Sequence, residues 1–263
     1  MYLKHSSAEV LMNRENVDTI LELLKEFQVV IPIIQRDYAQ GRNDDIARLV
    51  RKNLIRDMKL SLSDENTKLD LNFVYGKVED KKFIPVDGQQ RLTTLFLLHI
   101  FAYRSDDSMT ELLERFTYHT RTTSRDFFEK IVEHRFTVFN SSNTPQKEIK
   151  DLPWFISSWQ HDPTIQSALT MLDAIKEEFD DLEELASKLS CKELKPITFH
   201  FLDMENLGME DSLYIKLNAR GRPLSDFENF KARLLGRLEK ILPNLLEEYE
   251  INFDTKWADI FCK

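Results

Sequence analysis

The chain has 263 residues, enough to bury a sizeable core in one large domain or two modest ones. Its formal net charge of −9 argues against a protein that coats nucleic acid over its whole surface, although a local basic groove is compatible with it. The two cysteines, Cys191 and Cys262, lie far apart without a Cys/His cluster, which excludes a disulfide framework and a zinc site. No signal peptide and no apolar run of membrane-spanning length is visible, so we expect a soluble, cytoplasmic protein without a membrane partner.

The first part of the chain, residues 1–104, alternates helical and strand patterns, as expected for a small α/β unit. Helices are predicted over 16–27, 43–60 and 92–101, and strands over 29–34, 71–78 and 83–86. The last two strands form a predicted hairpin, and Pro32 places the first at a sheet edge or at a strand opening. The second helix is expected to bury the apolar stripe Ile46, Leu49, Val50, Leu54 and Met58.

From residue 105 to 263 the pattern is mainly helical, which makes the expected fold class α+β: a small mixed-sheet domain followed by a helical region. Helices are predicted over 111–116, 124–133 and 164–189, with one strand within 195–203 that returns to the first sheet and a helix-turn-helix-like motif over 210–238. The chain closes on the apolar segment 257–261, which suggests the front part of a longer protein.

A polar turn between the apolar strand 83–86 and the apolar helix 92–101 is the first candidate site. It consists of Asp87, Gly88, Gln89, Gln90 and Arg91. A strand, a glycine turn and a helix N-terminus direct backbone N–H groups and the helix dipole at a docked anion, and an arginine adds donors for phosphate or carboxylate. The alternative is a structural turn, in which Asp87 caps the helix and Arg91 pairs with a carboxylate.

A basic cluster within the helix-turn-helix-like motif is the candidate DNA surface. Gly221 suits the end of the first helix, and Ser225 and Glu228 form a capping box that starts the second. The positive side chains that gather there in an acidic protein are Lys216, Arg220, Arg222, Lys231 and Arg233. A solvated helix pair is the alternative.

Three motifs together resemble one family. They are Ile-Pro-Ile-Ile-Gln-Arg-Asp-Tyr (31–38), Val-Asp-Gly-Gln-Gln-Arg-Leu-Thr-Thr-Leu (86–95) and Leu-Asn-Ala-Arg-Gly-Arg-Pro-Leu (217–224). In order and spacing they resemble the N-terminal domain of GmrSD-type restriction endonucleases, a ParB/sulfiredoxin-like, DGQQR-motif family, over roughly residues 10 to 240. The resemblance implies a ParB-like nucleotide-binding unit in bacterial defence against phage or modified DNA. Its partners would be an NTP of unknown base, Mg²⁺, DNA and a nuclease domain or subunit.

The resemblance also assigns roles to residues. Asp87, Gln90 and Arg91 would be catalytic, with Asp87 also holding Mg²⁺ or a water. The nucleotide would be bound by Gln35, Arg36, Tyr38, Gly88, Gln89, Thr93, Asn218 and Gly221. Gln40 departs from the family pattern, because many relatives carry a tryptophan at that position.

The function expected from this pattern is the binding and hydrolysis of an NTP in a restriction system that acts on DNA. The alternative is a nucleotide-gated DNA-binding module without catalysis of its own. No Walker P-loop occurs, so the phosphates would have to be held by the DGQQR turn. A nuclease is the least supported function, since no His/Asn/His arrangement or carboxylate cluster can be assembled from the sequence.

Overall fold

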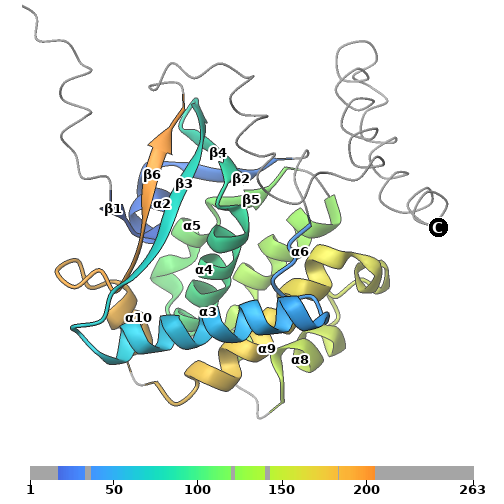
Figure 1. The fold of residues 1–263 in the computed structure, drawn as a ribbon. Helices are drawn as coiled ribbons and strands as arrows, with labels where there is room; N and C mark the ends of the chain where they lie inside the picture. The colour runs from blue at the N-terminus through green and yellow to red at the C-terminus, as the bar shows by residue number, and fades with distance from the viewer. Residues whose placement is uncertain (1–16, 33–36, 120–121, 140–142, 183, 205–263) are drawn as a thin grey trace, which may run out of the picture.

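The structure, a computed structural model, describes residues 17–32, 37–119, 122–139, 143–182 and 184–204 (Figure 1). Its strands form one six-stranded sheet in the order β1-β6-β3-β4-β2-β5. The strands are β1 (Val17–Asp18), β2 (Gln28–Ile31), β3 (Leu69–Glu79), β4 (Lys82–Asp87), β5 (Phe116–Tyr118) and β6 (Ile197–Asp203).

Strand directions in this sheet place three chain segments at one edge. β2 runs parallel to β4 on one side and to β5 on the other, so the carboxyl ends of these strands meet at the same edge. The predicted hairpin is confirmed, because β3 pairs antiparallel with β4. The predicted return strand is confirmed as well, because β6 pairs in parallel with β3.

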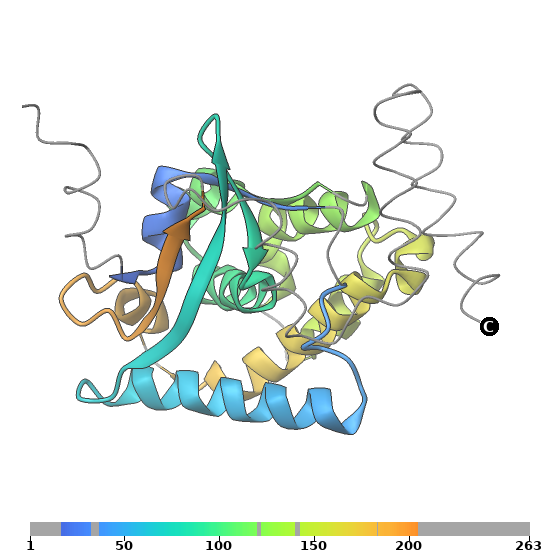
Figure 2. The same ribbon diagram turned by 45° about the horizontal axis from the view of Figure 1, so that its top comes forward.

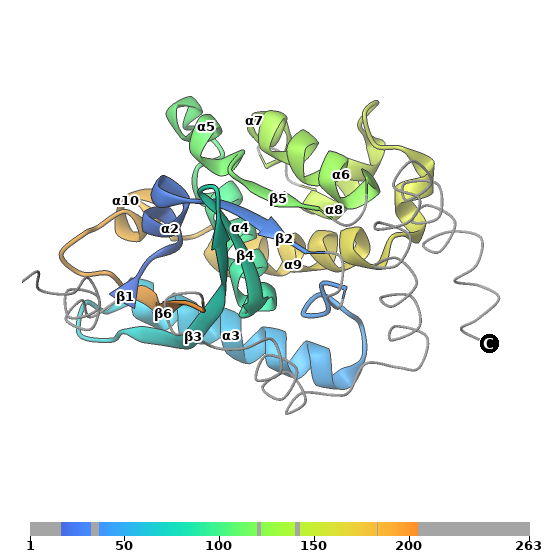
Figure 3. The ribbon, with the colours of Figure 1, turned by 90° about the horizontal axis from the view of Figure 1, so that it is seen from above.

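The helices are α2 (Ile20–Glu26), α3 (Asp45–Ser63), α4 (Gln89–Ala102), α5 (Thr110–Leu113), α6 (Thr122–Glu133), α7 (Arg135–Val138), α8 (Pro145–Asp151), α9 (Pro163–Phe179) and α10 (Leu185–Leu189). Two short 3-10 helices lie between them in the chain: η1 (Asp107–Met109) between α4 and α5, and η2 (Ser157–His161) between α8 and α9. In Figures 1 and 3, α4 lies beneath the sheet, α9 packs beside α4, and α3 packs beside α9. This mixed sheet with helices confirms the α+β class.

Helix α4 is the centre of the core. Leu92, Phe96 and Phe101 are fully buried, as expected for a helix that is apolar almost all round. The same continuous cluster contains Phe127 of α6 and Phe199 of β6, so residues on both sides of position 104 contribute to it. A domain boundary at residue 104 stays a prediction.

Two predictions about the first part of the chain are wrong. β2 is not an edge strand, since it pairs on both sides; it ends at Ile31, so Pro32 has no ladder bond to donate. The expected stripe of α3 mostly faces solvent, with Ile46 77% and Leu49 61% exposed, while Ile55, Met58 and Leu62 are buried. The helix carries apolar residues on two faces, and only its position along one side of the molecule selects the buried one (Figure 2).

Two further differences lie in the helical part. The helix predicted over 164–189 is broken: α9 ends at Phe179 and α10 begins at Leu185. An acidic run separates them, in which like charges one turn apart disfavour a continuous helix, and Glu184 adopts a positive φ of 59°. The segment at Phe116, predicted as the end of a helix, forms β5 instead, because pairing with β2 outweighs its local preference.

Candidate functional site

The turn between β4 and α4 is built around Gly88. Its φ of 89° lies in the left-handed region, and a Cβ there would come within 2.7 Å of a Val74 side-chain carbon, so both conformation and space require glycine. Within the described residues, no side chain makes a capping bond at the start of α4. The starts of α3 and α9, by contrast, are capped by Asp44 and Asp162. The first backbone N–H groups of α4 therefore have no side-chain cap among the described residues, which is also true of α8, and such groups can bond to water or to an anion.

Arg91 connects this turn to β3. Its guanidinium lies 2.7 Å from Asp87 Oδ2, and the two residues form an ion pair at a spacing of four positions. The guanidinium also donates to the backbone oxygen of Phe73 at 2.9 Å and to that of Leu71. The structural reading is thus half right: Arg91 does pair with a carboxylate, whereas Asp87 does not cap the helix. The Asp87 side chain is 48% exposed, so it can still be reached from solvent.

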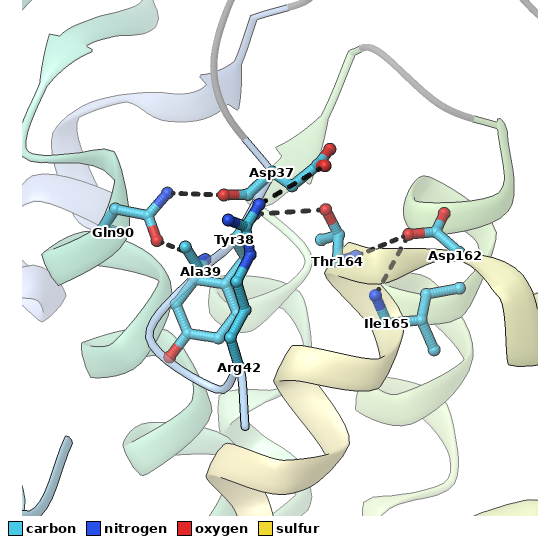
Figure 4. A network of polar contacts seen from close by, with 8 residues as sticks. All are labelled: Asp37, Tyr38, Ala39, Arg42, Gln90, Asp162, Thr164 and Ile165. Atoms are coloured by element: carbon cyan, nitrogen blue, oxygen red, sulfur yellow. Dashed lines mark hydrogen bonds and ion pairs between the residues drawn. The ribbon is translucent and has the colours of Figure 1, made fainter. Parts of the chain in front are cut away.

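The two glutamines of the motif fix the surrounding backbone. The Gln89 side chain is buried and its amide donates to Pro85 O at 2.6 Å, which tightens the turn. The Gln90 amide bridges a second segment: it donates to Asp37 O at 3.0 Å and accepts from the backbone N–H of Ala39 at 2.7 Å (Figure 4). Gln90 thereby holds the segment that follows β2 against the start of α4.

Buried hydroxyl groups continue this connection into the core. The Tyr38 hydroxyl lies 2.7 Å from Thr94 Oγ1, which is also hydrogen bonded to the Gln40 side chain. Burial raises the pKa of Tyr38 above its ordinary range, so its hydroxyl keeps its proton. Thr93 is likewise buried, with its hydroxyl 2.8 Å from that of Tyr118 in β5. These positions favour positioning roles for Tyr38 and Thr93 rather than contact with a ligand.

The start of α9 forms the other side of the site. Asp162 Oδ1 accepts from the backbone N–H groups of Thr164 and Ile165 at 2.8 and 3.2 Å (Figure 4). Its second oxygen accepts from the hydroxyl groups of Thr123 and Ser124 in the first turn of α6. Thr164 Oγ1 in turn accepts from the backbone N–H of Tyr38 at 3.3 Å. The starts of α4, α6 and α9 are therefore joined around residues 37–39.

The loop after residue 39 is packed tightly against α9. A Cβ at Gly41 would lie 1.7 Å from the backbone oxygen of Ser167, a contact that only glycine allows. Arg42 extends back to the Asp37 carboxylate at 3.8 Å, and Arg51 donates to the backbone oxygens of Gln40 and Arg42 at 3.0 Å. The predicted residues at positions 37–40 and 87–94 are thus brought together by tertiary contacts.

Part of the predicted site lies outside the described residues. This applies to Gln35, Arg36, Asn218 and Gly221, and to the basic set Arg220, Arg222, Lys231 and Arg233. Among the residues that the structure does describe, no group of three or more His, Cys, Asp or Glu side chains is placed to hold a metal ion. The helices of the described ranges also include none that is both long enough and apolar enough to cross a membrane.

Comparison with known proteins supplies the family. Residues 19–235 match the family described as GmrSD restriction endonuclease, N-terminal domain. The chain belongs to this family. A comparison with curated proteins found no significant match. Membership of the GmrSD family implies a role in restriction or phage defence that acts on DNA.

Some residues of this GmrSD-family site were missed by sequence reasoning. Asp162, Thr164 and Thr94 were not singled out, although each connects two elements of the site. An Asp-Pro pair before an apolar helix is a recognisable start signal, so Asp162 could have been identified as the cap of α9. Its contact with α6 and that of Thr164 with Tyr38 span 38 and 126 positions, which no local pattern reports.

Proposed function

We propose that this GmrSD-family domain binds a nucleoside triphosphate with Mg²⁺ at the start of α4 and hydrolyses it within a restriction system that acts on DNA. The observation that carries the proposal is the turn itself. An uncapped helix start follows a left-handed glycine, and a half-exposed carboxylate stands directly before it at the carboxyl end of β4. Such a helix start offers N–H donors and a positive dipole end to a phosphate group.

Each residue of the turn has a separate role in this proposal. Gly88 gives the turn its left-handed conformation, and Gln89 and Gln90 hold the turn and the 37–39 segment in place. Arg91 uses three of its hydrogen bonds on Asp87 and β3, and its remaining N–H donors can face charge that develops on the γ-phosphate. Gln35, Arg36, Asn218 and Gly221 would complete the pocket.

The residues present fit a magnesium ion that is held mainly by the nucleotide. Mg²⁺ at phosphate sites is bound by one or two carboxylates, with phosphate oxygens and water filling its remaining positions. Asp87 supplies one such carboxylate, and it can offer the oxygen that is not bonded to Arg91. When bound, the ion would neutralise phosphate charge and orient the attacking water, while Asp87 accepts a proton or a metal contact.

DNA and a nuclease are the proposed partners of this module. The basic set Arg220, Arg222, Lys231 and Arg233 would contact the DNA backbone, which predicts salt-sensitive affinity. Cleavage would be carried out by a nuclease domain or subunit that receives the signal from nucleotide turnover.

The test is a titration of the full chain with ATP, GTP, CTP and UTP plus Mg²⁺, recording the heat of binding and the release of phosphate. The variant Asp87→Asn is expected to lower phosphate release by about 100-fold, the scale of losing one transition-state contact. Asp45→Asn, an exposed carboxylate on α3, serves as the matched control and should leave turnover unchanged. Equal turnover in the Asp87→Asn variant and the wild type would refute the assignment, as would the absence of nucleotide binding by the wild type.

Binding without turnover is the second candidate, and the ion pair of Asp87 with Arg91 favours it. A carboxylate oxygen that already accepts a hydrogen bond from an arginine at 2.7 Å is less available to a metal ion or a water than a free one. A heat of binding without phosphate release would support this nucleotide-gated module. DNA affinity measured with and without nucleotide would then have to differ.

A further inference from the structure

Phe73 presents an aromatic ring on the outer face of the sheet. Side chains alternate along a strand, and Val74 next to it is fully buried, so Phe73 points away from the core. It is 52% exposed, one of the few large apolar side chains of the described residues for which this holds outside helix α3. The ring is therefore open to a ligand from solvent.

The backbone that presents this ring is held in a strained conformation. The register of β3 against β6 shifts between Asp70 and Phe73, and Asn72 between them adopts a φ of 61°. Asp70 accepts from the backbone N–H of Asn72 at 2.8 Å, and Arg91 binds the oxygens of Leu71 and Phe73 on the other side. Bulges of this kind change the direction of side chains and recur next to active sites.

A histidine on the neighbouring strand extends the ring surface. Phe73 is paired in register with His200 of β6, and their ring centroids are 5.2 Å apart at an angle of 38°. The imidazole Nε2 lies 3.1 Å from Asp70 Oδ2, which fixes the ring in that orientation. The centroid distance leaves no room for a third ring between the two, so a planar ligand would have to stack on the open side of Phe73.

We propose that Phe73 and His200 form a stacking platform for a nucleobase, either of the bound nucleotide or of a DNA strand. The inference deepens the proposed function and rests on it for the nucleotide source. The platform is coupled to the Asp87 turn, because one guanidinium, that of Arg91, binds both the Phe73 backbone and the Asp87 carboxylate. Nucleobases are present in both ligands proposed for this domain, the nucleoside triphosphate and DNA. Aromatic rings on an open sheet are a recurrent way to bind bases.

The experiment measures two ligands with the full chain: the nucleoside triphosphates with Mg²⁺ by calorimetry, and a fluorescein-labelled single-stranded oligonucleotide by anisotropy. Phe73→Ala is expected to weaken binding about 5- to 140-fold, which is the effect of removing one stacking side chain worth 1–3 kcal/mol. Phe73→Trp should keep the affinity. Ile156→Ala is the matched control, since Ile156 is 53% exposed and belongs to the segment between α8 and η2 rather than to the sheet. Melting curves establish that each variant is folded.

The pattern of losses identifies the source of the base. A loss with triphosphates, together with unchanged affinity for inorganic tripolyphosphate, assigns the platform to the nucleotide. A loss confined to the oligonucleotide assigns it to a DNA strand. If the wild type binds the oligonucleotide but no triphosphate, the proposed NTP site is refuted. The effect of Phe73→Ala on the affinity for the oligonucleotide then tests the platform by itself. Affinities of Phe73→Ala within twofold of wild type for every ligand that binds would overturn the platform, and so would a wild type that binds neither ligand.

Discussion

Lowering the pH should destabilise this domain through His99, a buried residue in the last turn of α4. The side chain is 3% exposed, and Nδ1 lies 2.7 Å from the backbone oxygen of Leu95, so it is the Nδ1–H tautomer that donates this bond. Burial disfavours the charged imidazolium and lowers the pKa of His99 from 6.5 to about 4. The folded protein therefore binds a proton at this site less readily than the unfolded chain.

The magnitude follows from this pKa difference. A group with a depressed pKa in the folded state contributes stability that is fully present above the unfolded value of 6.5, and this stability is lost as the pH falls. Between pH 7 and pH 5 the loss is about 2 kcal/mol, and it reaches a limit of about 3.4 kcal/mol below pH 4, at 1.36 kcal/mol for each unit of pKa difference.

Urea denaturation at pH 7 and pH 5 measures this loss directly. His99→Leu removes the titrating group and keeps a buried side chain of similar volume, so its free energy of unfolding should change less over the same interval, by about 2 kcal/mol. His161→Leu replaces a solvent-exposed histidine and should retain the pH response of the wild type. The same pH response in the wild type and in His99→Leu would refute the reasoning.

Two substitutions test the structural supports of the site and the helical part by urea denaturation at pH 7. Gly88→Ala should lower the free energy of unfolding by about 2 kcal/mol, because an L-residue in the left-handed region costs about 1–2 kcal/mol and the new Cβ meets a Val74 side-chain carbon at 2.7 Å. A decrease of less than about 0.5 kcal/mol would contradict the requirement for glycine in this turn. Arg135→Met should lower the free energy of unfolding by about 3 kcal/mol or more, since this fully buried guanidinium donates to the backbone oxygens of Tyr103, Val132 and Asp106. A free energy of unfolding equal to that of the wild type would show that these oxygens find other donors.

Local patterns were informative where the physical cause is local. The strand, glycine turn and helix at 83–101 were predicted because an apolar run, a residue suited to positive φ and an all-apolar helix each have a short-range signature. The hairpin of β3 and β4 was predicted for the same reason. The exposed stripe of α3 was mispredicted because its sequence is apolar on two faces, and the choice between them depends on what packs against the helix.

The sequence by itself determined the candidate turn at Asp87–Arg91 and, through its motifs, the family, because an apolar run, a glycine turn and a motif are all read from neighbouring residues. Only the tertiary structure decided which of these groups are already bonded. Gln90 holds the segment after β2, Arg91 is shared between Asp87 and the β3 bulge, and Tyr38 and Thr93 are buried in hydroxyl pairs. Apart from the Arg91–Asp87 pair, these contacts join residues 18 to 56 positions apart. The parallel pairing of β2 with β4 and β5 contributes to them, because it brings the carboxyl ends of these strands to one edge of the sheet.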